Sequence, residues 1–164
     1  MQIEQKEKIA QALCDVTEKM AFMFGEEAEQ DELLEAAQEG LEVKISFSGR
    51  DKGEITMLST PDMGVELAAN VLGIDHEEIN QEIIEDSLKE WLNVTCGHIL
   101  TTLAGSEAIY DLSAPEVRTV DSEIWDTSAR DANAMLFLID DQPMILMVHC
   151  EGLVGRGDNQ SDES

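Results

Sequence analysis

Basic residues are scarce in this sequence. It contains 10 lysines and arginines against 36 aspartates and glutamates, which gives a formal net charge of −26 at pH 7. A surface this acidic repels nucleic acids and anionic membranes, so we expect neither as a partner. We attribute most of the excess charge to solubility.

Long hydrophobic runs and a secretion signal are also missing. No apolar segment approaches the ~20 residues that a membrane-spanning helix requires. The first residues, MQIEQK, contain no basic region that leads into an apolar one. The cysteines, Cys14, Cys96 and Cys150, are too few and odd in number for a disulfide framework. We therefore expect a cytoplasmic protein.

The length and composition predict a single hydrophobic core. A chain of 164 residues with 43% hydrophobic residues can form one globular domain with a substantial interior. We expect that domain to cover residues 1–153. Residues 154–164 are acidic and rich in glycine and serine, which predicts a disordered tail.

Hydrophobic periodicity predicts helices and strands that recur in the same order in both halves. The predicted helices are residues 5–25, 61–72 and the long segment 83–103. The predicted strands are residues 41–48, 54–59, 108–112, 116–120, 132–139 and 144–150. Gly25 and Gly73 are expected to end the first two helices, and Asp75 with Glu78 is expected to cap the third in a capping box. Residues 121–131 are polar, and we predict a loop.

The long helix has two different faces. At ~100° per residue, one broad sector is apolar. That sector contains Ile84, Leu88, Trp91, Leu92, Thr95, Cys96, Ile99 and Leu103. Asp86, Glu90, Asn93 and Gly97 lie opposite, within about 60°. Asparagine and glycine are poor helix formers, so something other than helix stability favours them here. The alternative is an ordinary solvated polar face.

The pattern Asp86-x3-Glu90-x2-Asn93, followed by Pro115, resembles the signature helix of the CheC/CheX/FliY family of chemotaxis phosphatases. Pro115 lies one residue short of the family's spacing. The resemblance implies an α+β fold in which an antiparallel β-sheet packs against long helices in two pseudo-repeated halves. The first half offers Glu18-x2-Ala21, which lacks the amide, and this implies the single active site of the CheX branch.

The resemblance also implies a reaction and a partner. The chain would hydrolyse the phosphoaspartate of a CheY-like response regulator, with Asn93 orienting the attacking water and Glu90 pairing with the regulator's lysine. Asp86 and Gly97 would contact the partner. The protein would need no cofactor or metal of its own, because the Mg²⁺ would belong to the regulator. The alternative is a non-catalytic module that binds a receiver domain or dimerises in a two-component pathway.

Two further features have competing interpretations. The segment 144–150 is almost wholly apolar, so it is either a sheet edge paired across a homodimer or a central strand buried on both faces. The resemblance to the CheX branch favours the homodimer. Cys96-x-His98 and His149-Cys150 contain zinc-ligand types, but their spacing is not that of a zinc finger. We predict no metal site, and we interpret Cys14 and Cys96 as core residues.

Overall fold

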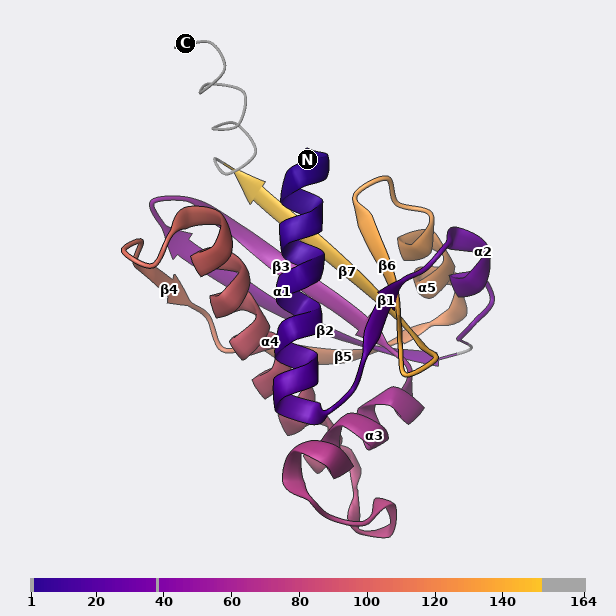
Figure 1. Ribbon diagram of the computed structural model, residues 1–164. Helices are drawn as coiled ribbons and strands as arrows, with labels where there is room; N and C mark the ends of the chain where they lie inside the picture. Colours follow the sequence, from indigo (N-terminus) through magenta and orange to yellow (C-terminus); the bar gives the residue numbers. More distant parts are fainter. Residues whose placement is uncertain (1, 38, 152–164) are drawn as a thin grey trace.

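The computed structural model describes residues 2–37 and 39–151, in which one antiparallel sheet forms the centre of the molecule (Figure 1). The strands are β1 Gly25–Glu27, β2 Glu39–Gly49, β3 Lys52–Ser59, β4 Tyr110–Leu112, β5 Glu116–Asp121, β6 Ala134–Ile139 and β7 Gln142–Glu151. Their order is β1-β6-β7-β3-β2, and β4 and β5 both pair with the outer edge of β2. The predicted strands are therefore all present.

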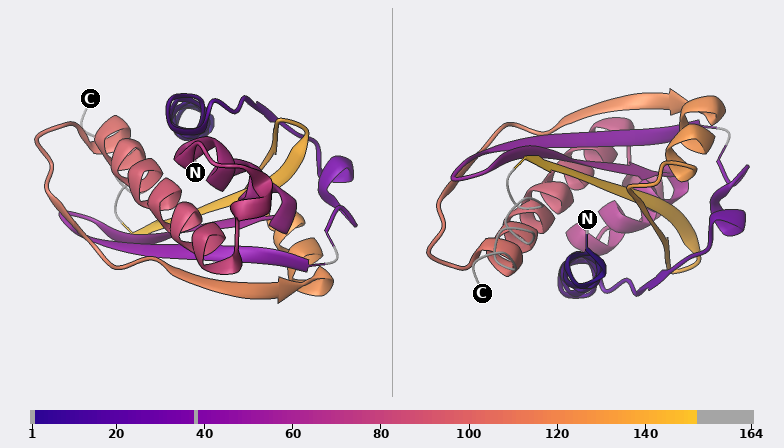
Figure 2. Two further views of the ribbon diagram at one scale, coloured as in Figure 1. Left: turned by 90° about the horizontal axis from the view of Figure 1, so that it is seen from below. Right: turned by 90° about the horizontal axis from the view of Figure 1, so that it is seen from above.

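Helices cover both faces of this sheet (Figure 2). The helices are α1 Ile3–Ala21, α2 Gln30–Leu33, α3 Pro61–Leu72, α4 Gln81–Ala104 and α5 Ser122–Ala129, with a 3₁₀ turn at His76–Glu78. The main core lies between the sheet and the layer formed by α1, α3 and α4. A smaller core lies beneath α2 and α5 on the other face. This layering confirms the predicted α+β class.

The two halves of the chain interlock. Each half contains a long helix, a strand, a short helix and a hairpin: α1, β1, α2, β2 and β3 in the first, α4, β5, α5, β6 and β7 in the second. The strand before each short helix pairs with the hairpin of the other half, β1 with β6 and β5 with β2. The halves meet where β3 pairs with β7. The topology therefore has a pseudo-two-fold axis between β3 and β7, with α1 and α4 in equivalent positions.

Two predicted helix ends are wrong. Asp75 makes no side-chain cap, because the chain after it forms a single 3₁₀ turn before α4 begins. The N-cap of α4 is instead Asn80, whose side-chain oxygen accepts a hydrogen bond from the N–H of Ile83 at 2.9 Å. Helix α1 ends at Ala21, and its C-cap is Phe22, which has a left-handed backbone (φ 55°), whereas Gly25 begins β1.

The predicted loop over residues 121–131 contains a helix, α5. Asp121 caps it by accepting a hydrogen bond from the N–H of Ile124 at 3.0 Å. Trp125 is fully buried, and its indole N–H donates to the carbonyl of Leu33 at 2.8 Å. A helix this short owes its stability to one docked tryptophan more than to its own turns, so periodicity did not reveal it.

Strand β7 is interior, not an edge. It pairs with β3 on one side and with β6 on the other. Met144, Ile145 and Leu146 are fully buried, because the two helical layers cover both faces of the strand. The expectation that this strand pairs with a second chain is wrong, and the alternative of a central strand is confirmed. The homodimer stays a prediction, and edge-to-edge pairing would have to use β1 or the β4–β5 edge.

Candidate functional site

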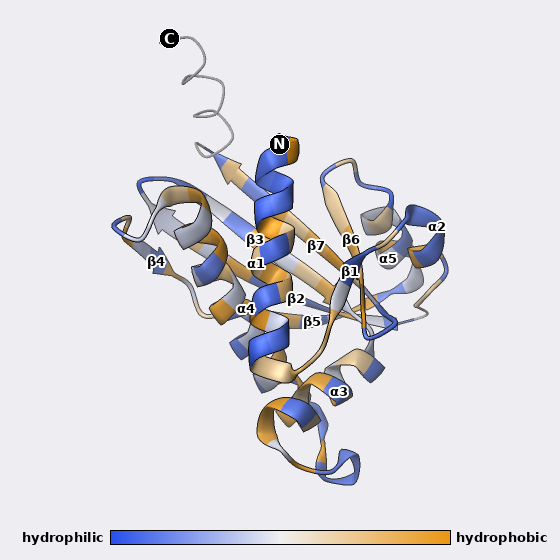
Figure 3. Cartoon of the chain, viewed as in Figure 1, coloured by the Kyte–Doolittle hydropathy of each residue, from blue (hydrophilic) through white to orange (hydrophobic). Residues whose placement is uncertain are grey.

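Helix α4 buries a continuous stripe of residues against the sheet and the neighbouring helices. Figure 3 shows hydrophobic and hydrophilic residues following one another along this helix. The buried residues are Ile84, Ser87, Leu88, Trp91, Leu92, Thr95, Cys96, Ile99 and Leu100. The predicted apolar sector is confirmed, except that Leu103 is only partly buried. This stripe decides which residues of α4 face outward.

A buried hydrogen bond fixes α4 against α1. The indole N–H of Trp91 donates to the hydroxyl oxygen of Thr17 at 3.0 Å, and that hydroxyl donates to the carbonyl of Leu13 at 2.7 Å. Trp91 and Thr17 are both fully buried. Because a buried polar group without a partner costs free energy, this pairing disfavours any rotation of α4 about its axis.

The outward face of α4 presents the four predicted site residues together. Asp86 and Glu90 are exposed, and Asn93 and Gly97 are half-buried. Among the residues that the structure describes, Asp86, Glu90 and Asn93 have no hydrogen-bond or ion-pair partner. A Cβ added at Gly97 would meet no atom within 4 Å beyond its own helix. The face is therefore open, with a carboxylate and an amide one turn apart and free to bind an external group.

Helix α1 has no equivalent pair. Its segment Ile3–Ala21 contains no asparagine. Ala21 is fully buried, and its carbonyl accepts a hydrogen bond from the side chain of Asn70 at 2.9 Å. Glu18 is exposed but has no amide beside it on an outward face. Pro115, the remaining element of the signature, lies between β4 and β5 and is half-buried.

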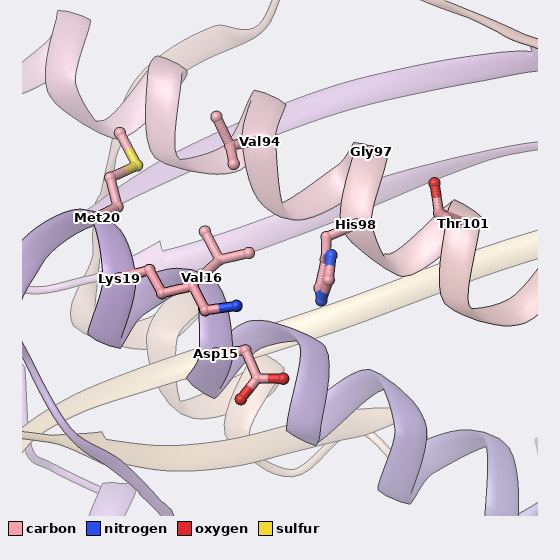
Figure 4. Close-up of a pocket in the computed structure, with 8 residues that line it drawn as sticks. All are labelled: Asp15, Val16, Lys19, Met20, Val94, Gly97, His98 and Thr101. Atoms are coloured by element: carbon pink, nitrogen blue, oxygen red, sulfur yellow. The ribbon is translucent and has the colours of Figure 1, made fainter. Parts of the chain in front are cut away.

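A groove between α1 and α4 adjoins this face, and sequence reasoning missed it. Its volume is about 450 Å³. Figure 4 shows the residues of both helices that line it. They are Asp15, Val16, Lys19 and Met20 of α1, and Val94, Gly97, His98 and Thr101 of α4. The one sign of this groove in the sequence was Val94, an apolar residue beside the polar face. The groove itself could not be predicted, because it forms only where α1 and α4 pack against each other.

The thiols of Cys14 and Cys96 do not provide a nucleophile. Burial raises the pKa of Cys96 to about 12, and it also raises the pKa of Cys14, aided by the charges of Asp15 and Glu27. Both are therefore protonated at neutral pH, which suits structural cysteines. Across residues 2–37 and 39–151, no three histidines, cysteines or carboxylates gather as metal ligands. Nor does that part of the chain contain a helix able to cross a membrane.

Comparison with known proteins identifies the family. The family model of the chemotaxis phosphatase CheX matches residues 41–137, so the chain belongs to the CheX family. The chemotaxis protein CheX of Desulfovibrio desulfuricans superposes with a TM-score of 0.66 at 14% identity, over 91% of this chain and 100% of that one. CheX of Vibrio vulnificus gives 0.68 at 17% identity, over 90% and 97%. Curated protein sequences yield no match.

A third similar structure contains a partner. It is the CheX–CheY–BeF₃–Mg²⁺ complex of Borrelia burgdorferi, which superposes with a TM-score of 0.61 at 15% identity, over 92% of this chain and 99% of that chain. At these identities the solved structures establish a shared fold. They confirm the predicted CheX-like architecture of antiparallel sheet and long helices.

Proposed function

We propose that this chain is a phosphatase that hydrolyses the phosphoaspartate of a CheY-like response regulator, with the outward face of α4 as its active surface. The observation that carries the proposal is the pair Glu90 and Asn93 on a helix that Trp91 fixes in place. Both side chains lack an internal partner within the described part of the chain. Membership of the CheX family supports the reaction class.

The reaction requires a water molecule placed in line with the bond that breaks. The water oxygen bonds to phosphorus as the bond from phosphorus to the aspartyl oxygen of the regulator breaks, and the carboxylate leaves. Because the transition state is loose, positioning and charge neutralisation supply most of the rate. Asn93 suits the positioning step, since its amide both accepts and donates hydrogen bonds and does not titrate.

The other residues of the face bind the regulator. Glu90 lies one turn before Asn93 and would form a charge-assisted hydrogen bond with the regulator's lysine. Asp86 is exposed one turn earlier and extends the acidic docking edge. Gly97 leaves room for a loop of the regulator to approach the helix. The Mg²⁺ would be held by the regulator, where it would neutralise charge on the phosphoryl oxygens.

The direct test is Asn93→Ala, assayed by phosphate release from a phosphorylated CheY. We expect kcat to fall by ~10²-fold or more, because the water is no longer oriented, while the unfolding transition is unchanged. The matched control is Asn133→Ala, which removes an exposed amide far from α4 along the chain and should keep wild-type turnover. An Asn93→Ala variant with wild-type kcat would show that this mechanism is wrong.

The same assay separates the phosphatase from its alternative. A non-catalytic receiver-binding module would bind phosphorylated CheY without accelerating phosphate loss. Binding without turnover by the wild-type chain would therefore favour the module over the enzyme.

A further inference from the structure

We propose that the groove between α1 and α4 is a second docking element of the active surface, and that it receives an apolar side chain of the response regulator. This inference rests on the proposed function, because its occupant is the proposed substrate. The groove would supply affinity and partner choice, whereas Glu90 and Asn93 would supply the chemistry.

The groove and the active surface are continuous. Gly97 belongs to both, since it lies on the outward face of α4 and also lines the groove. Val94 follows Asn93 directly in the chain and is 39% exposed. It is not part of either apolar core, so folding does not account for a valine here. A regulator seated over Asn93 would therefore lie beside Val94 and the open space above Gly97.

The composition of the groove suits an apolar side chain. Val16 and Met20 of α1 face Val94 of α4 across it (Figure 4). Contact between such residues and a partner removes apolar surface from water and is short-ranged. Binding of the regulator by this chain needs such a short-range attraction to offset repulsion between like charges. With a formal charge of −26, it repels a phosphorylated, carboxylate-rich regulator surface at long range.

Charge at the rim of the groove complements an anionic partner. Lys19 is exposed, and among the described residues its ammonium has no ion pair or hydrogen bond. Asp15, the acidic residue of the groove, already accepts a hydrogen bond from the side chain of Gln11 at 2.9 Å. The uncommitted charge of Lys19 is therefore available to an acidic group of the regulator next to the apolar contact.

The test is the binding of a CheY from the same organism, loaded with beryllofluoride and Mg²⁺, to a Val94→Asp variant. A carboxylate forced against an apolar partner group should weaken binding by about tenfold or more. In the phosphatase assay the same variant should raise KM with kcat unchanged, because the groove contributes equally to substrate and transition state. Val94→Leu keeps the apolar contact and should bind like the wild type.

The matched control is Thr102→Asp, which adds the same charge at an exposed position of α4 outside the groove. Equal affinities for Val94→Asp and Thr102→Asp would overturn the groove assignment and leave the phosphatase intact. Weaker binding by Val94→Asp in a chain that releases no phosphate would uphold the groove and overturn the phosphatase. A wild-type chain that binds no loaded CheY would overturn both.

Discussion

Helices α1 and α4 occupy equivalent positions in the two halves of the fold, yet their outward faces differ. Each buries an apolar stripe in the main core, and the two join through Trp91 and Thr17. On α4 the outward face carries a carboxylate and an amide one turn apart, Glu90 and Asn93, and neither bonds to another described residue, whereas the amide of Gln11 on α1 already donates to Asp15. When Glu18-x2-Ala21 of α1 is matched with Glu90-x2-Asn93 of α4, the residue in the place of Asn93 is Ala21, which is buried.

The contrast shows which constraints come from the fold. The sheet requires an apolar stripe from both helices, because each must cover the strands beneath it. Nothing inside the molecule requires a particular residue on the outward faces, since the side chains of Glu90 and Asn93 bond to no other described residue. The pair on the outward face of α4 therefore points to function, and we propose that α1 acts as one wall of a docking groove.

The largest expected effect is on the contact that the two helices share. Trp91→Ala should lower the free energy of unfolding by about 3–5 kcal/mol, because it empties a fully buried site and removes the donor to Thr17. Urea denaturation followed by circular dichroism measures this. A loss below about 1 kcal/mol would show that the helices do not depend on this contact.

The next largest expected effect distinguishes the outward face of α4 from that of α1 by its influence on catalysis. Glu90→Ala should lower kcat/KM for phosphorylated CheY by about tenfold or more, because it removes a charge-assisted hydrogen bond to the regulator. Glu18→Ala makes the same change on the exposed face of α1 and should leave kcat/KM at the wild-type value. Equal losses in the two variants would mean that α1 carries a second active surface.

The smallest effect has opposite signs for stability and activity. Gly97→Ala should raise the free energy of unfolding by about 0.5–1 kcal/mol, since alanine is the better helix former and its Cβ meets no neighbouring atom. The same methyl group would occupy the space in which we propose that a loop of the regulator approaches α4, so kcat/KM should fall. Urea midpoints and phosphate release, measured on one preparation, check both signs. A more stable and fully active variant would contradict the proposed approach of the regulator at Gly97.

Long periodic segments were predictable, and features that depend on a single contact were not. The stripe of α4 repeats over many turns, so its two faces could be read directly from the sequence. Helix α5 was missed because one tryptophan, Trp125, stabilises it through Leu33, which is remote in sequence. The capping box at Asp75 was predicted wrongly because Asn80, five residues later, offers the cap that α4 uses.

The sequence by itself determined most of the helices and strands, the helix that carries the candidate site and the residues on its outward face, because periodicity and residue type are local properties of the chain. The α+β class followed from the resemblance of that helix to the signature of a known family. Only the tertiary structure decided that β7 is interior, since an apolar strand has the same pattern at a covered edge and in the centre of a sheet. It also decided where the α1–α4 groove lies. That groove depends on the angle and depth at which two helices cross, which packing of the whole core sets.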